Sequence, residues 1–332
     1  MRSRATAPGA RRNKSPGCYL AKPPAMRARY PDEEGYVERG GIRTFYEVYG
    51  SGDPTLLFLP AWAIGYSRFW KSQVPYFARL YRVVTFDPRG NGKSDRPLEP
   101  AAYVDTEYVQ DALAVMDATD TQNAIMVGFS MGAWLAAILA AHHPDRVLGA
   151  VMAGSSCPLG QLLPDRRGYS FDDPNQTEEG WGKLNRHYLR RDYRGFLQFF
   201  YSKIFSEPHS TKQIDDGVSW GLETTPEVLI ATRDSPDLST YMVEHLDEAV
   251  TLYKSIRCPL LLIHGDRDNV TSYSRSTAIT EVTGAPLVTI VSGGHHVFGR
   301  EPVRANLLVR DFIDRIYGPW SNLGRNIGMA GT

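Results

Sequence analysis

A chain of 332 residues is long enough to bury a large core, and its 42% hydrophobic and 11% aromatic content is typical of a globular protein. The formal net charge is zero, but residues 1–30 carry eight basic side chains and no acidic one, which leaves 29 basic against 37 acidic groups in the rest. This mildly acidic body argues against nucleic acid as the principal partner, because phosphate binding needs a basic face on the folded domain.

The first thirty residues are rich in Arg, Pro, Gly and Ala and lack hydrophobic periodicity, so we expect a disordered basic tail over 1–30. They contain no apolar stretch typical of a secretory signal, and Met26 is an alternative start of the chain. The three cysteines are widely spaced, which predicts neither a disulfide framework nor a zinc site. We therefore expect a cytoplasmic protein that needs no metal and no cofactor.

Strand patterns and helix patterns alternate along the first half of the chain. Residues 36–49 alternate around Gly40-Gly41 and predict an antiparallel hairpin. Continuous apolar runs predict buried strands, at 55–59, 82–86, 147–152 and from residue 124. Helical spacing predicts helices, at 69–80, at 107–116 and after residue 130. Strands and helices in regular succession predict a parallel sheet with right-handed crossovers and helices on both faces.

One apolar stretch passes from strand to helix through a single sharp turn at Ser130. The turn has the pattern Gly128-Phe-Ser130-Met131-Gly132, a nucleophile elbow. A serine at a strained corner needs small neighbours two residues before and after it, and Gly128 and Gly132 provide that room. The corner places the hydroxyl beyond the end of the sheet and directs the Met131 N–H, at the helix N-terminus, toward an oxyanion formed at Ser130.

Two stretches resemble features of other protein classes. Residues 124–141 carry no charge and approach the length that spans a bilayer. Gly, Ser and Gly interrupt this run, and a central strand followed by a buried helix explains it, so we expect no integral membrane segment. The glycine-rich loop 87–95 lacks the spacing of a phosphate-binding loop. We expect a tight turn there, in which Asp87 and Arg89 pair with each other and with nearby backbone.

The alternation of strands and helices stops between residues 156 and 255. This segment has no long β-branched run and carries aromatic residues and leucines at helical intervals, over 181–189, 193–205, 226–232 and 241–253. It is too long for an ordinary loop, so we predict a helical cap over 156–255 that acts as a lid over a pocket.

The sheet pattern resumes after the predicted cap. Further elements follow in order, with strands at 259–263 and 287–291, a helix at 272–282 and a last helix at 302–317 that Gly318 ends. The predicted core therefore consists of residues 31–155 and 256–317, and a loose C-terminal tail occupies 318–332.

Three chemically active side chains follow predicted strands. Ser130, Asp268 and His295 each lie just beyond the carboxyl end of a parallel strand, where open α/β sheets gather their ligands. A neutral imidazole can take the proton of an attacking hydroxyl near pH 7, so His295 is the predicted base. Asp268 would accept a hydrogen bond from the other imidazole nitrogen, fix its tautomer and stabilise the cation that forms.

The order Ser, Asp, His, the elbow and the position of the cap together resemble the α/β-hydrolase superfamily over about residues 36–317. Residues 87–94, Asp-Pro-Arg-Gly-Asn-Gly-Lys-Ser, are similar to the family's Asp-x-Arg-Gly-x-Gly-x-Ser segment. Residues 264–268, His-Gly-Asp-Arg-Asp, are similar to its acid turn. The resemblance implies the α/β-hydrolase fold, a mostly parallel eight-stranded sheet with helices on both faces and an inserted helical cap.

Two site assignments have local alternatives. Asp266 could replace Asp268, but the family's turn carries the acid at its second aspartate. His296 could replace His295, but the glycine pair directly before His295 fits the family's Gly-x-Gly-His pattern. The other histidines, His264 among them, are expected to be structural.

The chain departs from the family in the loop after the first parallel strand. The family usually has His-Gly-x at this point, and this chain has Pro60-Ala61-Trp62. Because proline has no N–H, Trp62 is the candidate for the second backbone donor of an oxyanion hole, with Met131 as the first. The Trp62 ring is either a wall of the pocket or ordinary core packing.

These features predict a serine hydrolase of the carboxylic ester class (EC 3.1.1) that acts on a small or medium apolar acyl compound. Ser130 attacks the carbonyl, an acyl-enzyme forms, and His295 activates the water that releases the acid. Serine at the elbow argues against dehalogenases and epoxide hydrolases, which carry aspartate there. A cofactor-free perhydrolase and a C–C bond hydrolase remain alternatives, as does a ligand receptor with little turnover. The oligomeric state is open, a homodimer included.

Overall fold

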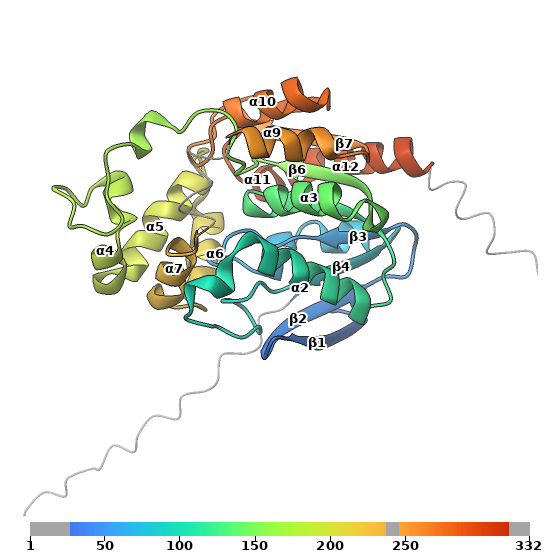
Figure 1. Ribbon diagram of the computed structural model, residues 1–332, viewed down its shortest axis with the longest axis horizontal. Helices are drawn as coiled ribbons and strands as arrows, with labels where there is room; N and C mark the ends of the chain where they lie inside the picture. Colours follow the sequence, from blue (N-terminus) through green and yellow to red (C-terminus); the bar gives the residue numbers. More distant parts are fainter. Residues whose placement is uncertain (1–26, 237–245, 319–332) are drawn as a thin grey trace, which may run out of the picture.

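The computed structural model describes residues 27–236 and 246–318. An eight-stranded sheet lies at its centre, with the strand order β1-β2-β4-β3-β5-β6-β7-β8 (Figure 1). β2 pairs antiparallel with both β1 and β4, and the other neighbours pair parallel. The predicted mostly parallel eight-stranded sheet is confirmed. The strands are β1 (Glu33–Arg39), β2 (Ile42–Tyr49), β3 (Thr55–Phe58), β4 (Arg82–Phe86), β5 (Ala124–Phe129), β6 (Val147–Ala153), β7 (Leu260–Gly265) and β8 (Leu287–Ile290).

Most of each predicted tail lies outside the described residues. Arg27 and Arg29 belong to the tail predicted over 1–30, yet they form ion pairs with Glu47 and Asp32. Ordered structure therefore begins before residue 31. None of the helices in the described ranges is long and apolar enough to cross a membrane.

The central strands are apolar throughout because both faces of the sheet are covered. In β5, Ile125 and Val127 belong to one core and Met126, between them, belongs to the other. The core around Met126 is covered by α2 (Asp105–Ala118), α3 (Met131–His142), α9 (Leu246–Ser255) and α10 (Ser274–Thr283). The opposite core is covered by α1 (Val74–Phe77), α11 (Val297–Arg300) and α12 (Pro302–Tyr317). β5 therefore lies deep in the molecule, with its carboxyl end fixed from both sides.

Local signals placed some helices well and failed for others. α12 has the predicted limits, with Pro302 in its first turn and Gly318, at φ +99°, after its last. The helix predicted over 69–80 is instead a short 3-10 helix (Ser67–Trp70) followed by α1. Pro75 explains the break, because it has no N–H for a helix that continues through it, although it is well placed in the first turn of α1.

The inserted segment, residues 156–236, contains α4 (Arg186–Arg191), α5 (Tyr193–Ile204), α6 (Thr211–Gly221) and α7 (Pro226–Arg233). Figure 1 shows these helices grouped beyond one end of the sheet. α9, which the sequence analysis included in the cap, packs instead on α3 and α10, where the Tyr253 and Trp134 rings lie 5.9 Å apart. The boundary predicted at residue 255 therefore lies too late in the chain. The first part of the helix predicted over 241–253 lies outside the described residues.

The loop 87–95 is a hydrogen-bonded turn, but its two charged residues do not pair with each other. Asp87 accepts hydrogen bonds from the backbone N–H groups of Ser67 and Lys93. Arg89 instead reaches α2, where its guanidinium group forms two hydrogen bonds of 2.7 Å with Asp111. The expected pair between Asp87 and Arg89 was wrong, because α2 offers Arg89 a buried carboxylate.

Candidate active site

Ser130 occupies the corner between β5 and α3 in a backbone conformation that residues other than glycine rarely adopt. Its φ of 56° and ψ of −119° place it in a strained region. A Cβ atom at Gly128 would lie 2.2 Å from the carbonyl oxygen of Gly132, and one at Gly132 would lie 2.7 Å from that of Pro60. Both glycines are therefore required by backbone that passes too close for a side chain.

We expect Gly128→Ala to lower the free energy of unfolding by about 3 kcal/mol, because the new methyl group meets the backbone of α3. Gly149→Ala, on the neighbouring strand β6, is the matched control. A Cβ there would lie 2.7 Å from the flexible end of the Ile316 side chain, so the expected loss is about 1 kcal/mol. Urea unfolding measures both variants. Equal losses of unfolding free energy in Gly128→Ala and Gly149→Ala would contradict this expectation.

Asp268 and His295 meet beyond the carboxyl ends of β7 and β8. The Asp268 Oδ2 to His295 Nδ1 distance is 2.7 Å, and the two residues are only 5% and 2% exposed. The other carboxylate oxygen, Oδ1, accepts from the backbone N–H groups of Val270 and Thr271. These contacts fix the carboxylate and the imidazole in one orientation. Asp266 is exposed, so the turn buries its second aspartate and not its first.

His264 is a residue that the sequence analysis assigned only a structural part. It is fully buried, and its Nε2 lies 2.9 Å from Asp268 Oδ2, the same oxygen that His295 contacts. Its Nδ1 lies 2.7 Å from Ser276 Oγ. The Thr271 hydroxyl donates to this Asp268 oxygen as well. Asp268 thus accepts five hydrogen bonds. The spacing of four residues between His264 and Asp268 across a tight turn was the available signal for this contact.

The environment of Asp268 favours its ionised form. Burial alone would raise the pKa of this carboxyl, but the charge of His295 and the hydrogen bonds of His264 and His295 outweigh burial and hold the pKa well below its usual range. Because folding favours the carboxylate, its contribution to stability is complete above pH about 4 and is lost as the pH falls further.

His296 lies next to His295 in sequence but in a different environment. Its ring stacks on Phe129 at 4.4 Å and on Phe69 at 5.0 Å, and its Nδ1 accepts a hydrogen bond from the Gly299 N–H. Burial among these rings lowers the pKa of His296 to about 3. His296 is therefore a neutral residue of the core, and His295 is the histidine that contacts Asp268.

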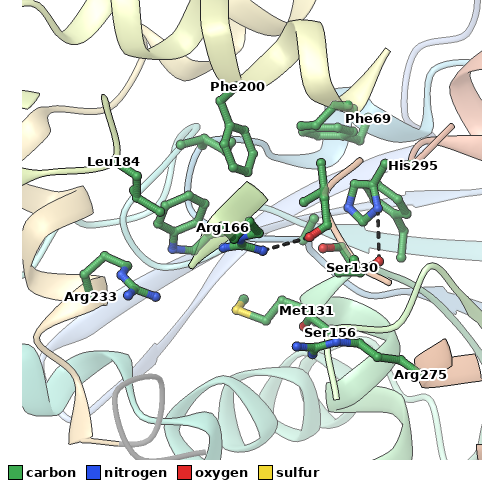
Figure 2. Close-up of a pocket in the computed structure, with 17 residues that line it drawn as sticks. Phe69, Ser130, Met131, Ser156, Arg166, Leu184, Phe200, Arg233, Arg275 and His295 are labelled. Atoms are coloured by element: carbon green, nitrogen blue, oxygen red, sulfur yellow. Dashed lines mark hydrogen bonds between the residues drawn. The ribbon is translucent and has the colours of Figure 1, made fainter. Parts of the chain in front are cut away.

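Ser130 and His295 line one cavity, in which the sequence analysis predicted the reaction (Figure 2). Within the described ranges, no hydrogen bond joins the Ser130 hydroxyl to the imidazole. Such bonds are often long in unliganded sites and shorten when substrate binds. Met131, the first residue of α3, lines the same cavity, and its N–H lies at a helix N-terminus, where backbone donors lack partners within the helix.

The cavity walls are mainly apolar and come from both the core and the inserted segment. The Trp62 ring is one wall, with its centre 5.5 Å from that of Phe200 and its Nε1 donating a 2.8 Å hydrogen bond to Thr232 of α7. The ring also packs against both hydrophobic cores, so it has both of the roles that the sequence analysis offered as alternatives. Other apolar side chains that line the cavity are Ile64, Phe69, Leu184, Ile204 and Val270.

Three arginines, Arg166, Arg233 and Arg275, also line this cavity, and the sequence analysis missed them. They come from three distant parts of the chain and belong to no motif, so no local signal pointed to them. Burial lowers the pKa of each of them, and for Arg166, to about 10, the positive charges of the other two add to the effect. The arginines remain protonated at neutral pH, so the cavity is positively charged.

Comparison with known proteins agrees with this geometry. A family model described as the alpha/beta hydrolase fold matches residues 54–302. The chain is 27% identical over 280 residues to the AB hydrolase superfamily protein YisY of Bacillus subtilis (strain 168), covering 82% of this chain and 95% of that protein. It is also 27% identical over 284 residues to the 2-hydroxymuconate semialdehyde hydrolase of Pseudomonas sp. (strain CF600), covering 82% and 91%.

The solved structures that resemble this chain include esterases. The esterase RhEst1 from Rhodococcus sp. ECU1013 aligns with a TM-score of 0.69 at 25% identity, covering 86% of this chain and 98% of that one. The family match and these relatives support hydrolase activity. Because the family match covers well over half of the chain, from β3 to the start of α12, the chain belongs to the α/β-hydrolase family.

Proposed function

We propose that this protein is a serine hydrolase that cleaves an ester-like bond of a small or medium-sized acyl substrate. The observation that supports this most directly is the 2.7 Å contact between Asp268 and His295 at the wall of the cavity that the Ser130 hydroxyl also lines. A buried Asp–His pair beside a strained serine is the arrangement that turns an alcohol into a nucleophile.

The reaction divides into two steps. His295 takes the proton of Ser130 as the serine oxygen attacks the carbonyl carbon, and the same proton passes to the leaving alcohol when the carbon–oxygen bond of the ester breaks. Water then attacks the acyl-enzyme, with His295 again as the base, and the acid leaves as Ser130 regains its proton. Each turnover consumes one ester and one water and releases one acid and one alcohol.

The negative charge that develops on the carbonyl oxygen needs fixed donors. The Met131 N–H at the start of α3 is the first donor, and the Trp62 N–H, in the loop after β3, is the second. Leu184, Phe200 and Ile204 of the inserted segment line the cavity, which supports a role for this segment as the lid. Their apolar side chains exclude water from the developing charge, which strengthens the two hydrogen bonds.

The test combines turnover with covalent labelling. Esters of 4-nitrophenol with acyl chains of increasing length should give a burst of 4-nitrophenol equal to the enzyme concentration, followed by slower release. A fluorophosphonate should stop turnover, and mass spectrometry of the digested protein should place the label on Ser130. If the reagent leaves Ser130 unlabelled while a bound ligand still raises the melting temperature, the protein is a receptor on the same fold.

A further inference from the structure

The arginines of the cavity converge from separate elements. Arg166 follows β6, Arg233 is the last residue of α7, and Arg275 lies in the first turn of α10. In Figure 2, Arg233 lies on the side of the cavity away from His295, the Arg166 guanidinium group lies between these two residues, and Arg275 lies near Ser156. Three cations around a mainly apolar cavity are costly, because burial removes water from each charge and like charges repel. Arg275 donates a hydrogen bond to the Cys157 carbonyl, so the question is which partners Arg166 and Arg233 have.

The contacts of two of these arginines leave their charges without a carboxylate. Arg166 donates a 2.7 Å hydrogen bond to the Val270 carbonyl, and its guanidinium group lies 4.2 Å from the centre of the Trp181 ring. Arg233 lies 5.4 Å from the centre of the Phe171 ring, and its buried Nε has no hydrogen-bond partner. Within the described ranges, neither arginine forms an ion pair with an acidic residue.

The acidic groups nearby already have partners. Asp172 and Asp234 both form ion pairs with Arg186, and the one negative charge left over acts on Arg233 from a distance, without a hydrogen bond to it. Asp165 and Asp268, whose charges act on Arg166, also have other partners. Asp165 pairs with Lys203 and accepts a hydrogen bond from the Trp181 ring, and Asp268 accepts its five hydrogen bonds. Arg166 and Arg233 therefore keep guanidinium donors that no carboxylate of the described residues accepts, and the carboxylate of a bound ligand would accept them.

We propose that the substrate carries a carboxylate in addition to the acyl group that Ser130 attacks, and that Arg233 and Arg166 bind this carboxylate. The proposal rests on the hydrolase function proposed above. A guanidinium group presents a planar fork of donors that matches the two oxygens of a carboxylate. Apolar walls such as Trp62 and Leu184 suit the chain between the two groups. The substrate is thus apolar in its middle and anionic at one end, rather than apolar throughout.

The experiment compares two esters that differ in one charge. Mono(4-nitrophenyl) glutarate carries a carboxylate at the end of its acyl chain, and 4-nitrophenyl pentanoate carries a methyl group there. The wild-type protein should hydrolyse the glutarate ester with a kcat/KM about tenfold to a hundredfold higher, because a charge-assisted hydrogen bond has that effect on binding. Arg233→Met should reduce this ratio to about one, mainly through KM. Arg233→Lys, which keeps the charge but not the fork, should restore part of the preference.

Arg190→Gln is the matched control, because Arg190 is exposed on α4 and does not line the cavity. It should keep both the ratio and the absolute rates. Arg233→Met should fold with a melting temperature close to that of the wild type, because the lost attraction of Asp172 and Asp234 is offset by the removal of a cation that repels Arg166 and of a buried donor without a partner. A ratio near one in the wild type, or a ratio that survives Arg233→Met, would overturn the carboxylate site.

A binding measurement separates this proposal from the hydrolase function. Glutarate should raise the melting temperature of the wild-type protein and of Arg190→Gln, but not that of Arg233→Met. If this pattern holds while neither ester is hydrolysed, the carboxylate site stands and the hydrolase function fails. If both esters are hydrolysed and glutarate does not stabilise the wild type, the carboxylate site is wrong. Inorganic phosphate that stabilises more than glutarate would also count against a carboxylate.

Discussion

Ser130→Ala should lower kcat for ester hydrolysis by about 10⁶-fold, because Ser130 provides the alcohol at the strained corner between β5 and α3, in the same cavity as His295. The remaining rate would come from binding and from the backbone donors of the cavity alone. Alanine keeps the strained backbone conformation, so the variant should melt at the wild-type temperature. Steady-state rates over long incubations, together with fluorophosphonate labelling, measure the loss.

Ser130→Gly is the variant that separates chemistry from strain. Glycine adopts a φ of 56° with a ψ of −119° at little cost. A residue with a side chain in this conformation stores about 1–3 kcal/mol of backbone strain. Ser130→Gly should therefore be as inactive as Ser130→Ala and yet melt a few degrees higher. More than about 1% of wild-type activity in either variant would mean that another group is the nucleophile.

The sequence predicted the strands well because of where the strands lie. A central parallel strand such as β5 is buried on both faces, so its sequence is a continuous apolar run that needs no information from elsewhere in the chain. α12 was predicted with its limits because Pro302 and Gly318 mark its two ends. Signals of this kind are local, and local signals can be read from one sequence.

Elements whose residues are determined by contacts with distant parts of the chain were harder to predict. α6 contains Gly217, which disfavours a helix, but a Cβ there would lie 2.2 Å from the Tyr201 ring of α5. The glycine is thus explained by packing between helices, and it concealed α6 from the sequence analysis. The pairing of Arg89 with Asp111 on α2 was missed for the same reason.

The candidate site also contains residues of both kinds, those with a local sequence signal and those without one. The order of Ser130, Asp268 and His295 and the glycines of the elbow could be named in advance because each belongs to a turn directly after a strand. The arginines of the cavity could not, because Arg166, Arg233 and Arg275 come together only when the inserted segment folds over the sheet. Motifs thus predict the candidate attacking group, whereas the residues that the inserted segment brings to the cavity become known only from the structure.

Asp268→Asn should lower kcat by about 10⁴-fold while the protein remains folded. In the wild type, Asp268 Oδ2 accepts from His295 Nδ1, which leaves the other imidazole nitrogen free to take the serine proton. An amide N–H in that place would donate to Nδ1 and put the imidazole proton on the wrong nitrogen. Rotating the amide would point its N–H groups at the Val270 and Thr271 N–H donors instead. Both orientations of the amide therefore disable the base.

Asp266→Asn is the matched control for this loss, because Asp266 lies two residues away in the same turn and is exposed. Its rates should stay within about twofold of the wild type. Burst kinetics with a 4-nitrophenyl ester should show that Asp268→Asn slows the burst itself, because the base acts in the formation of the acyl-enzyme as well as in its hydrolysis. If Asp266→Asn lost the activity and Asp268→Asn kept it, the acid of the site would be Asp266, and the buried network around Asp268 would have only a structural function.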